Sequence, residues 1–518
     1  MRVLLTVTVV LGLVVAAAGP AVAAPAAPPA DLLAVVTLPS KDGLAGVAAF
    51  ADRVQPGAGA MVGGLVAQGL GELAGPGSLE AVAAGKPLRL LVLEPPGGKT
   101  AVAVVVPVKD AKALARAVGP DVEVKSGRGW AVLGQPGTPA RLAPWALSTL
   151  VAEKAPAVPT ASLFPAALFA AHRAAIEQVG AQMVLGATTG AGATPEIGPM
   201  MGAMVDGMLA AFEATARLDV TIDATAERLV LDLAATPRPG TPLAALVAAQ
   251  RPSRFPLLDR LPLDGATVFV AGRFASGPYQ AAVMKAMQPL LAKSLGGTLD
   301  DKQRAALAGI WNAVEGELAF AGALGSPMAM IGLYAVADPK AVAAHMDTIA
   351  SAFSAGMQTE VAGVVMRTKG GRDKTPIDGV TFRRSTTTFD YSKLSKADAA
   401  AKRAVQGDQM EARWAVWDDV VGYVTGGDAL TSARRLVAVS RGKAKSAPPP
   451  PLVAAMLDEA RARRDSLIMI MDVAAVVAQA AGKAPSSAGP VAIGIGFADT
   501  RAHLTLTLPS ASVTAIKP

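Results

Sequence analysis

Residues 218–237, LDVTIDATAERLVLDLAATP, alternate apolar and polar side chains in two runs that a short polar turn separates. In the first run Leu218 and Val220 share one face, and Leu229 begins the same alternation in the second. This period-two pattern is typical of a β-ribbon with one covered face. Residues 491–510, VAIGIGFADTRAHLTLTLPS, repeat the pattern with the turn in the same place. The sequence therefore predicts a two-stranded ribbon near the end of each half of the chain.

The elements that precede the two ribbons follow a similar order. Apolar strands at residues 31–40, DLLAVVTLPS, and 264–274, DGATVFVAGRF, each lead into a predicted helix, the second at residues 276–295. Residues 316–349 then repeat the strand–strand–helix pattern of the first half, and we expect Asp338 to cap that helix. We predict an α+β fold of two related domains. Each is expected to be an antiparallel or mixed β-sheet covered on one face by long Ala-rich helices.

The repeat sets the expected domain boundaries. Residues 31–250 form the first α+β repeat, and residues 263–518 form the second. Residues 251–262 connect them as a linker, because this stretch opens with the proline and charged residues that are typical of a domain boundary. The second repeat also carries a polar, basic insertion at residues 367–403 that has no counterpart in the first.

The start of the chain has the features of a secretory signal peptide. Arg2 precedes an apolar run that is shorter than the ~20 residues of a membrane-spanning helix, and small residues follow at Ala21 and Ala23. We predict a signal peptide at residues 1–24 and a Pro/Ala linker at residues 25–30. The alternative is an uncleaved anchor helix. The mature protein is expected in the periplasm or outside the cell.

The composition argues against several classes of enzyme. The 518 residues include no cysteine, so a thiolate nucleophile, a disulfide and a Cys-ligated metal are excluded. The three histidines, His172, His345 and His503, stand singly without the spacing of metal ligands. Ser440 and Lys443 match the spacing of a Ser-x-x-Lys pair, but that chemistry needs the serine at a helix start in a dry pocket. We therefore expect a non-enzymatic protein that uses no cofactor and no metal.

Positive charge is concentrated in the second half of the chain. Residues 367–445 hold 16 basic and 9 acidic residues, and this difference of 7 equals the net charge of the whole chain. One interpretation is a patch that attracts a membrane surface or anionic glycans, and the other is an insertion that only keeps an apolar protein soluble. Nucleic acid is not expected, because the protein is exported and few stacking aromatic residues accompany the charges. The candidate residues are Arg367, Lys369, Arg372, Lys374, Arg383, Arg384, Arg434, Arg435, Arg441, Lys443 and Lys445.

A second candidate site is apolar. In residues 200–212, MMGAMVDGMLAAF, helical spacing places Met201, Met204, Met208 and Phe212 along one face. Flexible thioether side chains adapt to irregular partners, so this face is a candidate for holding an apolar ligand between sheet and helices. The alternative is an ordinary hydrophobic core.

The layout resembles that of a loose group of secreted or envelope-associated bacterial proteins with domains of unknown function. The likeness rests on the signal peptide, the strand DLLAVVTLPS and the segment PGTPLAALV at residues 239–247, which follows the first ribbon. It implies an α+β fold and a place in the bacterial envelope, and it supplies no catalytic residue and no protein partner. The leading hypothesis is a non-enzymatic binding or structural protein of the envelope. The alternatives are a carrier of a lipid or other apolar ligand, and a hydrolase or degenerate peptidase with an unrecognised site.

Overall fold

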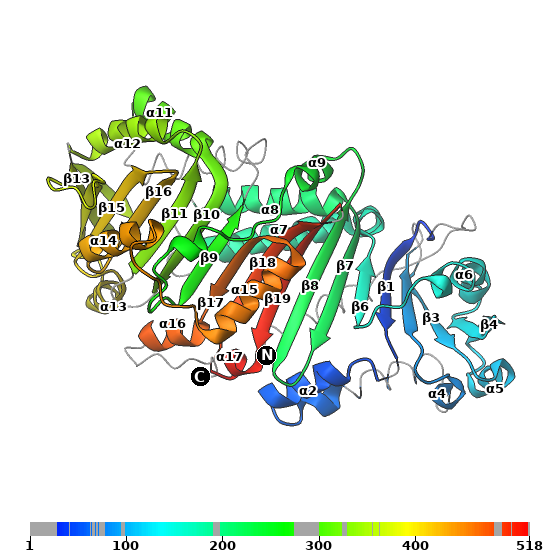
Figure 1. Cartoon of the computed structure of the whole chain (residues 1–518). Helices are drawn as coiled ribbons and strands as arrows, with labels where there is room; N and C mark the ends of the chain where they lie inside the picture. The colour runs from blue at the N-terminus through cyan, green and yellow to red at the C-terminus, as the bar shows by residue number, and fades with distance from the viewer. Residues whose placement is uncertain are drawn as a thin grey trace. The chain divides into compact units, whose positions relative to one another are not determined.

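The computed structural model describes residues 28–40, 42–62, 64, 68, 71, 78–94, 99–189, 197–273, 300–323, 329–354, 356–361, 363–480, 489–498 and 500–515. The predicted signal peptide, the first half of the linker after it and the predicted helix at residues 276–295 lie outside this part of the chain. The α+β fold class is confirmed, since helices and antiparallel strands alternate along the chain (Figure 1). No helix among these residues is both long enough and apolar enough to cross a bilayer.

The chain divides into two compact units that do not follow chain order throughout. The first comprises Met1–Gly180, Met208–Ala244 and Arg501–Ser510, and the second comprises Ala181–Gly207, Ala245–Thr500 and Ala511–Pro518. The last strand of the chain thus belongs to the first unit, where it pairs with a strand that lies far away in the sequence.

The sheet of the first unit contains nine antiparallel strands in the order β19-β8-β7-β6-β1-β2-β3-β5-β4. The predicted ribbon at residues 218–237 is confirmed, because β7 and β8 form a hairpin in which Val220 lies opposite Leu233. The strands are β1 (Leu32–Leu38), β2 (Leu88–Leu93), β3 (Ala101–Pro107), β4 (Glu123–Gly127), β5 (Trp130–Gly134), β6 (Thr160–Leu163), β7 (Thr215–Ala224), β8 (Arg228–Pro237) and β19 (Arg501–Pro509).

Helices lie on both faces of this first sheet. Leu142 and Trp145 of α6 belong to the same hydrophobic cluster as Val105 of β3, whereas Leu114 of α5 clusters with Val104. Neighbouring residues of a strand point to opposite faces, so α5 and α6 cover opposite faces of the sheet. This differs from the predicted single covered face. The helices in this half of the chain are α2 (Ala45–Val54), α4 (Ser78–Ala81), α5 (Ala111–Ala117), α6 (Thr138–Ala146), η1 (Leu150–Ala152), α7 (Pro165–Thr189), α8 (Ile197–Glu213) and α9 (Pro242–Ala249).

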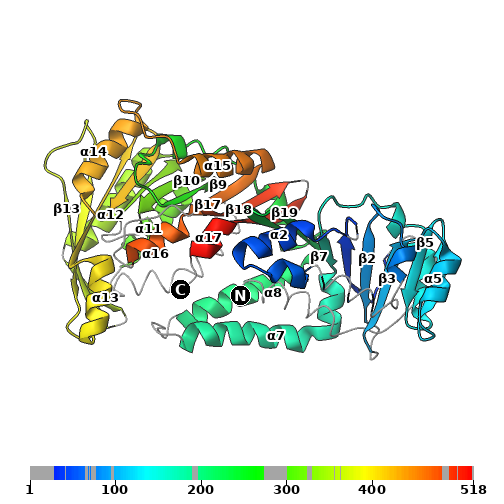
Figure 2. The ribbon, with the colours of Figure 1, turned by 90° about the horizontal axis from the view of Figure 1, so that it is seen from below.

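The two longest of these helices, α7 and α8, run side by side (Figure 2). Near one end of the pair, Arg173 Nη2 of α7 donates to Glu213 Oε1 of α8 at 2.6 Å. Phe169 and Phe212 contact each other next to this ion pair, with 5.6 Å between their ring centroids.

The sheet of the second unit contains ten antiparallel strands in the order β18-β17-β9-β10-β11-β16-β15-β14-β13-β12. These strands are β9 (Val268–Arg273), β10 (Val314–Ala323), β11 (Ala329–Val336), β12 (Met357–Val361), β13 (Val364–Arg372), β14 (Arg383–Asp390), β15 (Gln409–Trp417), β16 (Val420–Thr425), β17 (Asp465–Met471) and β18 (Val491–Ala498).

Helix α12 of the second half begins at a polar cap. The predicted cap is confirmed, since Asp338 Oδ1 accepts a hydrogen bond from the Ala341 amide at 2.9 Å and the helix begins at Pro339. These helices are η2 (Leu258–Arg260), α11 (Asp301–Ala313), α12 (Pro339–Ser354), α13 (Lys396–Gln406), α14 (Ala429–Ser440), α15 (Pro451–Arg463), α16 (Val473–Ala480) and α17 (Ser510–Ala515).

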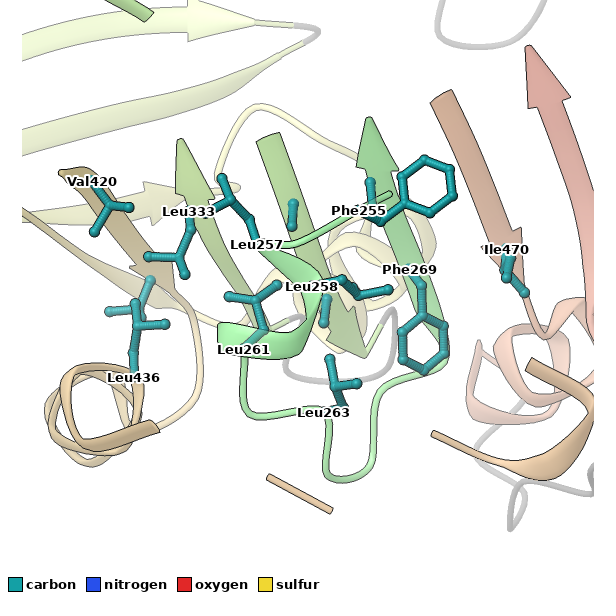
Figure 3. Close-up of a cluster of buried hydrophobic side chains, with 14 of the residues drawn as sticks. Phe255, Leu257, Leu258, Leu261, Leu263, Phe269, Leu333, Val420, Leu436 and Ile470 are labelled. Carbon is teal, nitrogen blue, oxygen red and sulfur yellow. The ribbon is translucent and has the colours of Figure 1, made fainter. Parts of the chain in front are cut away.

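The core of the second unit is centred on a segment that falls inside or beside the predicted linker. Phe255, Leu258 and Leu261 are at most 1% exposed, and Figure 3 shows the side chains around η2 among Leu333 of β11 and Leu436 of α14. Fully burying side chains of this kind contributes about 1.5–3 kcal/mol each. Burial of residues 255–261 therefore stabilises the packing of α14 on the sheet.

Helices cover both faces of this second sheet as well. Val420 of β16 packs in the same cluster as Leu436 of α14, and the next residue, Val421, packs with Val342 of α12. Because adjacent strand residues alternate between faces, α14 and α12 lie on opposite sides of β16. The second unit therefore differs from the prediction that helices cover only one face of each sheet.

Candidate anion-binding site

A pocket of about 730 Å³ opens in the second unit between the β13–β14 loop and α14. Figure 2 shows the long hairpin of β13 running up beside this helix. Five of the lining residues are cations and two are carboxylates, so the wall carries a formal charge of +3. The lining residues are Arg372, Asp373, Lys374, Thr375, Pro376, Ile377, Asp378, Arg384, Arg413, Leu430, Arg434 and Ala438.

Three neighbouring strands form the floor of the pocket. Arg384 of β14 lies directly opposite Arg413 of β15, and Gly371 of β13 lies opposite Arg384 on its other side. Directly opposed residues of antiparallel strands point to the same face, so the two arginines share the face that α14 covers. Arg384 Nε lies 3.8 Å from the position that a Cβ at Gly371 would occupy. This is an ordinary van der Waals distance, so the Arg384 side chain lies beside Gly371 without depending on the missing side chain.

Arg413 is held by carboxylates on two sides. It is 4% exposed, its Nε donates to Glu411 Oε1 at 2.6 Å, and its Nη1 forms an ion pair with Asp373. A buried guanidinium is costly unless such partners compensate its charge. Arg413 therefore acts mainly as a fixed anchor for Asp373 at the start of the pocket loop.

The tip of the loop has a defined turn. The Ile377 amide donates to the Val380 carbonyl at 2.9 Å, and the Val380 amide donates to the Ile377 carbonyl at 2.8 Å. Between them, Asp378 and Gly379 have φ values of 51° and 81°. Positive φ at both central residues is what a two-residue type I′ turn requires, and an Asp-Gly pair suits it.

The base of the loop is anchored in the core. The Asp373 amide donates to the Phe382 carbonyl at 2.9 Å, which closes the loop. Phe382 is fully buried and packs against Trp417, with 5.9 Å between the ring centroids. Lys374, the cation of the loop, is therefore carried on a preorganised segment, and binding would not require the loop to become ordered.

Helix α14 forms the opposite wall. Leu430, Arg434 and Ala438 are spaced by four residues, which places them on one face of the helix. Asp428 caps the helix, because its Oδ1 accepts from the Thr431 amide at 3.0 Å and its Oδ2 accepts from the Thr431 hydroxyl at 2.7 Å. The amide hydrogen bond from Thr431 is the main cause that lowers the pKa of the Asp428 carboxyl from its ordinary value.

Three cations of the pocket have side chains that form no hydrogen bond and no ion pair with the described residues. Lys374, Arg384 and Arg434 are exposed, and of the three only Arg434 interacts electrostatically with a carboxylate in that part of the chain, that of Asp428. They come from the loop, the sheet and the helix, respectively. The two carboxylates of the wall are already engaged, because Asp373 binds Arg413 and Asp378 lies 3.1 Å from Lys443 Nζ. The free charge of the pocket is therefore positive.

The structure brings only part of the predicted basic patch into this pocket. Arg372, Lys374, Arg384 and Arg434 line it, although Arg372 also pairs with Asp347 of α12. Lys369 and Lys445 are exposed and do not line the pocket. The other five predicted residues are held in ion pairs: Arg367 with Asp390, Arg383 with Asp347, Arg435 with Asp264, Arg441 with Asp418 and Lys443 with Asp378.

The other residue pairs singled out in the sequence have separate surroundings. Ser440 lies at the end of α14, accepts from Trp417 Nε1 at 3.1 Å and donates to the Val437 carbonyl at 3.1 Å. Its hydroxyl thus has structural partners, and Lys443 pairs with Asp378. Within the described ranges, no three His, Asp or Glu side chains gather in a way that could hold a metal ion.

The predicted apolar face lies on α8. Met201 is half-buried, Met208 is 54% exposed, and Phe212 contacts Phe169. The side chain of Met204 lies outside what the structure describes. The binding of an apolar ligand at this face stays a prediction.

Comparison with known proteins yields no family for this chain. No family model matches the sequence, and no curated protein matches it. Among solved structures, crystal form I of TP0453 is 10% identical, with a TM-score of 0.23, and the match covers 50% of this chain and 96% of that one. Crystal form IV of TP0453 is 11% identical, with a TM-score of 0.24, and the match covers 52% of this chain and 98% of that one. TM-scores this low do not establish a shared fold.

Proposed function

We propose that this chain is an exported, non-enzymatic protein of the bacterial envelope that binds anionic molecules through the pocket between the β13–β14 loop and α14. The observation that carries the proposal is the convergence of Lys374, Arg384 and Arg434, which come from three elements and whose side chains form no hydrogen bond or ion pair with the described residues. Export is supported by the charged start, the apolar run and the small residues at Ala21 and Ala23.

The arrangement of these cations supports binding over simple solubility. Cations that only keep a protein soluble have no need to converge on one concave surface. Lys374, Arg384 and Arg434 repel one another where they meet, and a bound anion would offset that repulsion.

The position of the pocket within the fold supports a specialised role of the second half. If β1, β2, β3, β5, β6 and β7 are matched with β9, β10, β11, β16, β17 and β18, both sheets follow the same strand order. Strand β4, which pairs with β5, matches β15, which pairs with β16. We propose that the two halves arose by duplication. Strands β12, β13 and β14 have no counterpart in the first half, and two of them build the pocket.

A vesicle-binding measurement tests the proposal. The full mature chain is sedimented with phosphatidylcholine vesicles that contain or lack phosphatidylglycerol, at low and at high salt. A membrane-facing Lys or Arg contributes about 1 kcal/mol. The variant Lys374→Gln/Arg384→Gln/Arg434→Gln should therefore bind anionic vesicles at least about tenfold more weakly.

The matched control is Lys369→Gln/Lys396→Gln/Lys445→Gln, which removes the same charge from exposed positions that do not line the pocket. It should retain most of the binding. Equal binding of the wild type to neutral and anionic vesicles would contradict the proposal. An equal loss in both triple variants would show that net charge, and not the pocket, determines binding.

A further inference from the structure

We propose that the pocket recognises an organic phosphate monoester in preference to singly charged anions. This inference rests on the proposed anion-binding function and adds the chemical class of the ligand. It is carried by three features of the pocket: the number of unpartnered cations, their distribution over separate walls, and an apolar strip beside them.

The number of cations favours a doubly charged group. Lys374, Arg384 and Arg434 present three positive charges, whereas Asp373 and Asp378 are occupied by Arg413 and Lys443. A phosphate monoester carries about −1.5 to −2 charges at neutral pH. A carboxylate, a sulfate ester or a phosphate diester carries a single charge, so it leaves more of the positive charge uncompensated.

The distribution of the cations favours a group with three terminal oxygens. Arg384 projects from the sheet and Arg434 from the helix, and each guanidinium is a planar fork that can donate two parallel hydrogen bonds. Lys374 adds a point charge from the loop. A monoester offers three terminal oxygens to donors on three sides, whereas a diester offers only two.

The remaining wall indicates that the phosphate is attached to an organic group. Pro376 and Ile377 of the loop and Leu430 and Ala438 of α14 line the same pocket. The volume of about 730 Å³ lies within the ~300–1,000 Å³ typical of small-molecule sites. An inorganic ion would leave this apolar strip uncovered, whereas a glycerol or sugar phosphate would cover part of it.

Calorimetric titration of the full mature chain with matched anions tests the inference. The probes are methyl phosphate, dimethyl phosphate, methyl sulfate and glycerol 3-phosphate. At pH 7.5 methyl phosphate should bind at least about tenfold more tightly than dimethyl phosphate or methyl sulfate, and glycerol 3-phosphate should bind more tightly still.

A pH series supplies an independent readout. The second pKa of a phosphate monoester is about 6, so at pH 5 most of the ligand carries one charge, while lysine and arginine stay protonated. The affinity for methyl phosphate should fall several-fold between pH 7.5 and pH 5, and that for methyl sulfate should change by less than about twofold. Arg384→Gln and Arg434→Gln should each remove most of the monoester preference, with an unchanged melting temperature showing that the fold is retained.

The outcomes separate the inference from the proposed function. Equal affinity for all four probes would overturn the monoester preference and leave anion binding intact. No binding of any probe, together with no binding to anionic vesicles, would overturn both. Vesicles containing phosphatidic acid, whose headgroup is a monoester, should bind more tightly than vesicles containing phosphatidylglycerol if the ligand is a lipid. If glycerol 3-phosphate binds and methyl phosphate does not, the pocket recognises the glycerol group and the monoester preference is overturned.

Discussion

Arg384 and Arg413 lie directly opposite each other on neighbouring antiparallel strands, and their side chains share one face of the sheet. Their surroundings differ. Arg413 is buried and held by Asp373 and Glu411, whereas the Arg384 side chain is exposed and forms no hydrogen bond or ion pair with the described residues. The first arginine therefore positions the loop, and the second is available to a ligand.

The buried ion pair should be sensitive to the loss of one partner. Replacing Arg413 by Met leaves the Asp373 carboxylate without its main cation in a mostly buried setting. Breaking a buried pair costs about 3–5 kcal/mol, so we expect Arg413→Met to lower the free energy of unfolding by about 3 kcal/mol in chemical denaturation.

The control for this variant removes the stranded charge as well. Arg413→Met/Asp373→Asn should recover at least about 1 kcal/mol of the loss, because the neutral amide is less costly to bury than the carboxylate. A change of less than about 0.5 kcal/mol in the single variant would show that Arg413 is not a buried ionic anchor.

Position 422 should not tolerate a side chain larger than that of glycine, because Gly422 packs against Trp417. Gly422 lies under the Trp417 ring, and a Cβ at this position would overlap the ring atoms. Overpacking a core typically costs about 1–3 kcal/mol, so Gly422→Ala should destabilise the second unit by about 2 kcal/mol. Chemical denaturation followed by tryptophan fluorescence measures this effect.

A second glycine supplies the comparison for this substitution. Gly207 lies in α8 with open space around its Cβ position. Gly207→Ala should be neutral or stabilising by up to about 1 kcal/mol, because alanine is the better helix former. Similar destabilisation by both substitutions would contradict the close packing assigned to Trp417.

The cap of α14 should make stability depend on acid pH. Hydrogen bonds from Thr431 lower the pKa of Asp428 below its ordinary value of 3.8. A carboxyl group whose pKa is lower in the folded than in the unfolded state stabilises the folded protein at pH values above its unfolded pKa. This contribution is lost as the pH falls through the folded pKa. The difference in melting temperature between wild type and Asp428→Ala should be largest near pH 7 and shrink below about pH 4.

Asparagine at this position gives the control, because it also caps helices but does not titrate. Asp428→Asn should therefore lose less stability than the wild type on acidification. If the melting temperature of Asp428→Ala stays below that of the wild type by the same amount at every pH, the Asp428 carboxylate does not act as the cap.

Export should remove the N-terminal segment. After expression in a bacterial host with an intact secretion system, N-terminal sequencing of the exported chain should begin at Ala24 or Pro25. Detection of residues 3–18 in the exported protein would instead support an uncleaved anchor.

Local features of the fold could be predicted from the sequence because interactions between residues close in the sequence determine them. The alternation in residues 218–237 predicts the β7–β8 hairpin, and the Asp338-Pro339 dipeptide predicts the start of α12. The pairing of β8 with β19 could not be predicted in this way. It brings Leu231 opposite Leu506, and local periodicity does not specify a partner so far away in the sequence.

The candidate site was only partly predictable for the same reason. The density of basic residues identifies Lys374, Arg384 and Arg434, but only the tertiary fold places the helix beside the β13–β14 loop. Arg413 was missed because it stands alone in the sequence. A signal was present, since Arg413 shares its strand face with Ala415 and Trp417, and a charge on a buried face indicates specific partners, one of which is Glu411 on the same face.

Diffraction from crystals of the mature chain soaked in tungstate, a tetrahedral dianion with a strong anomalous signal, tests the location of the site most directly. The account predicts an anomalous peak within hydrogen-bonding distance of the Arg384 and Arg434 guanidinium groups, and its loss in Lys374→Gln/Arg384→Gln/Arg434→Gln. A pocket that stays empty while tungstate occupies other basic positions would contradict it.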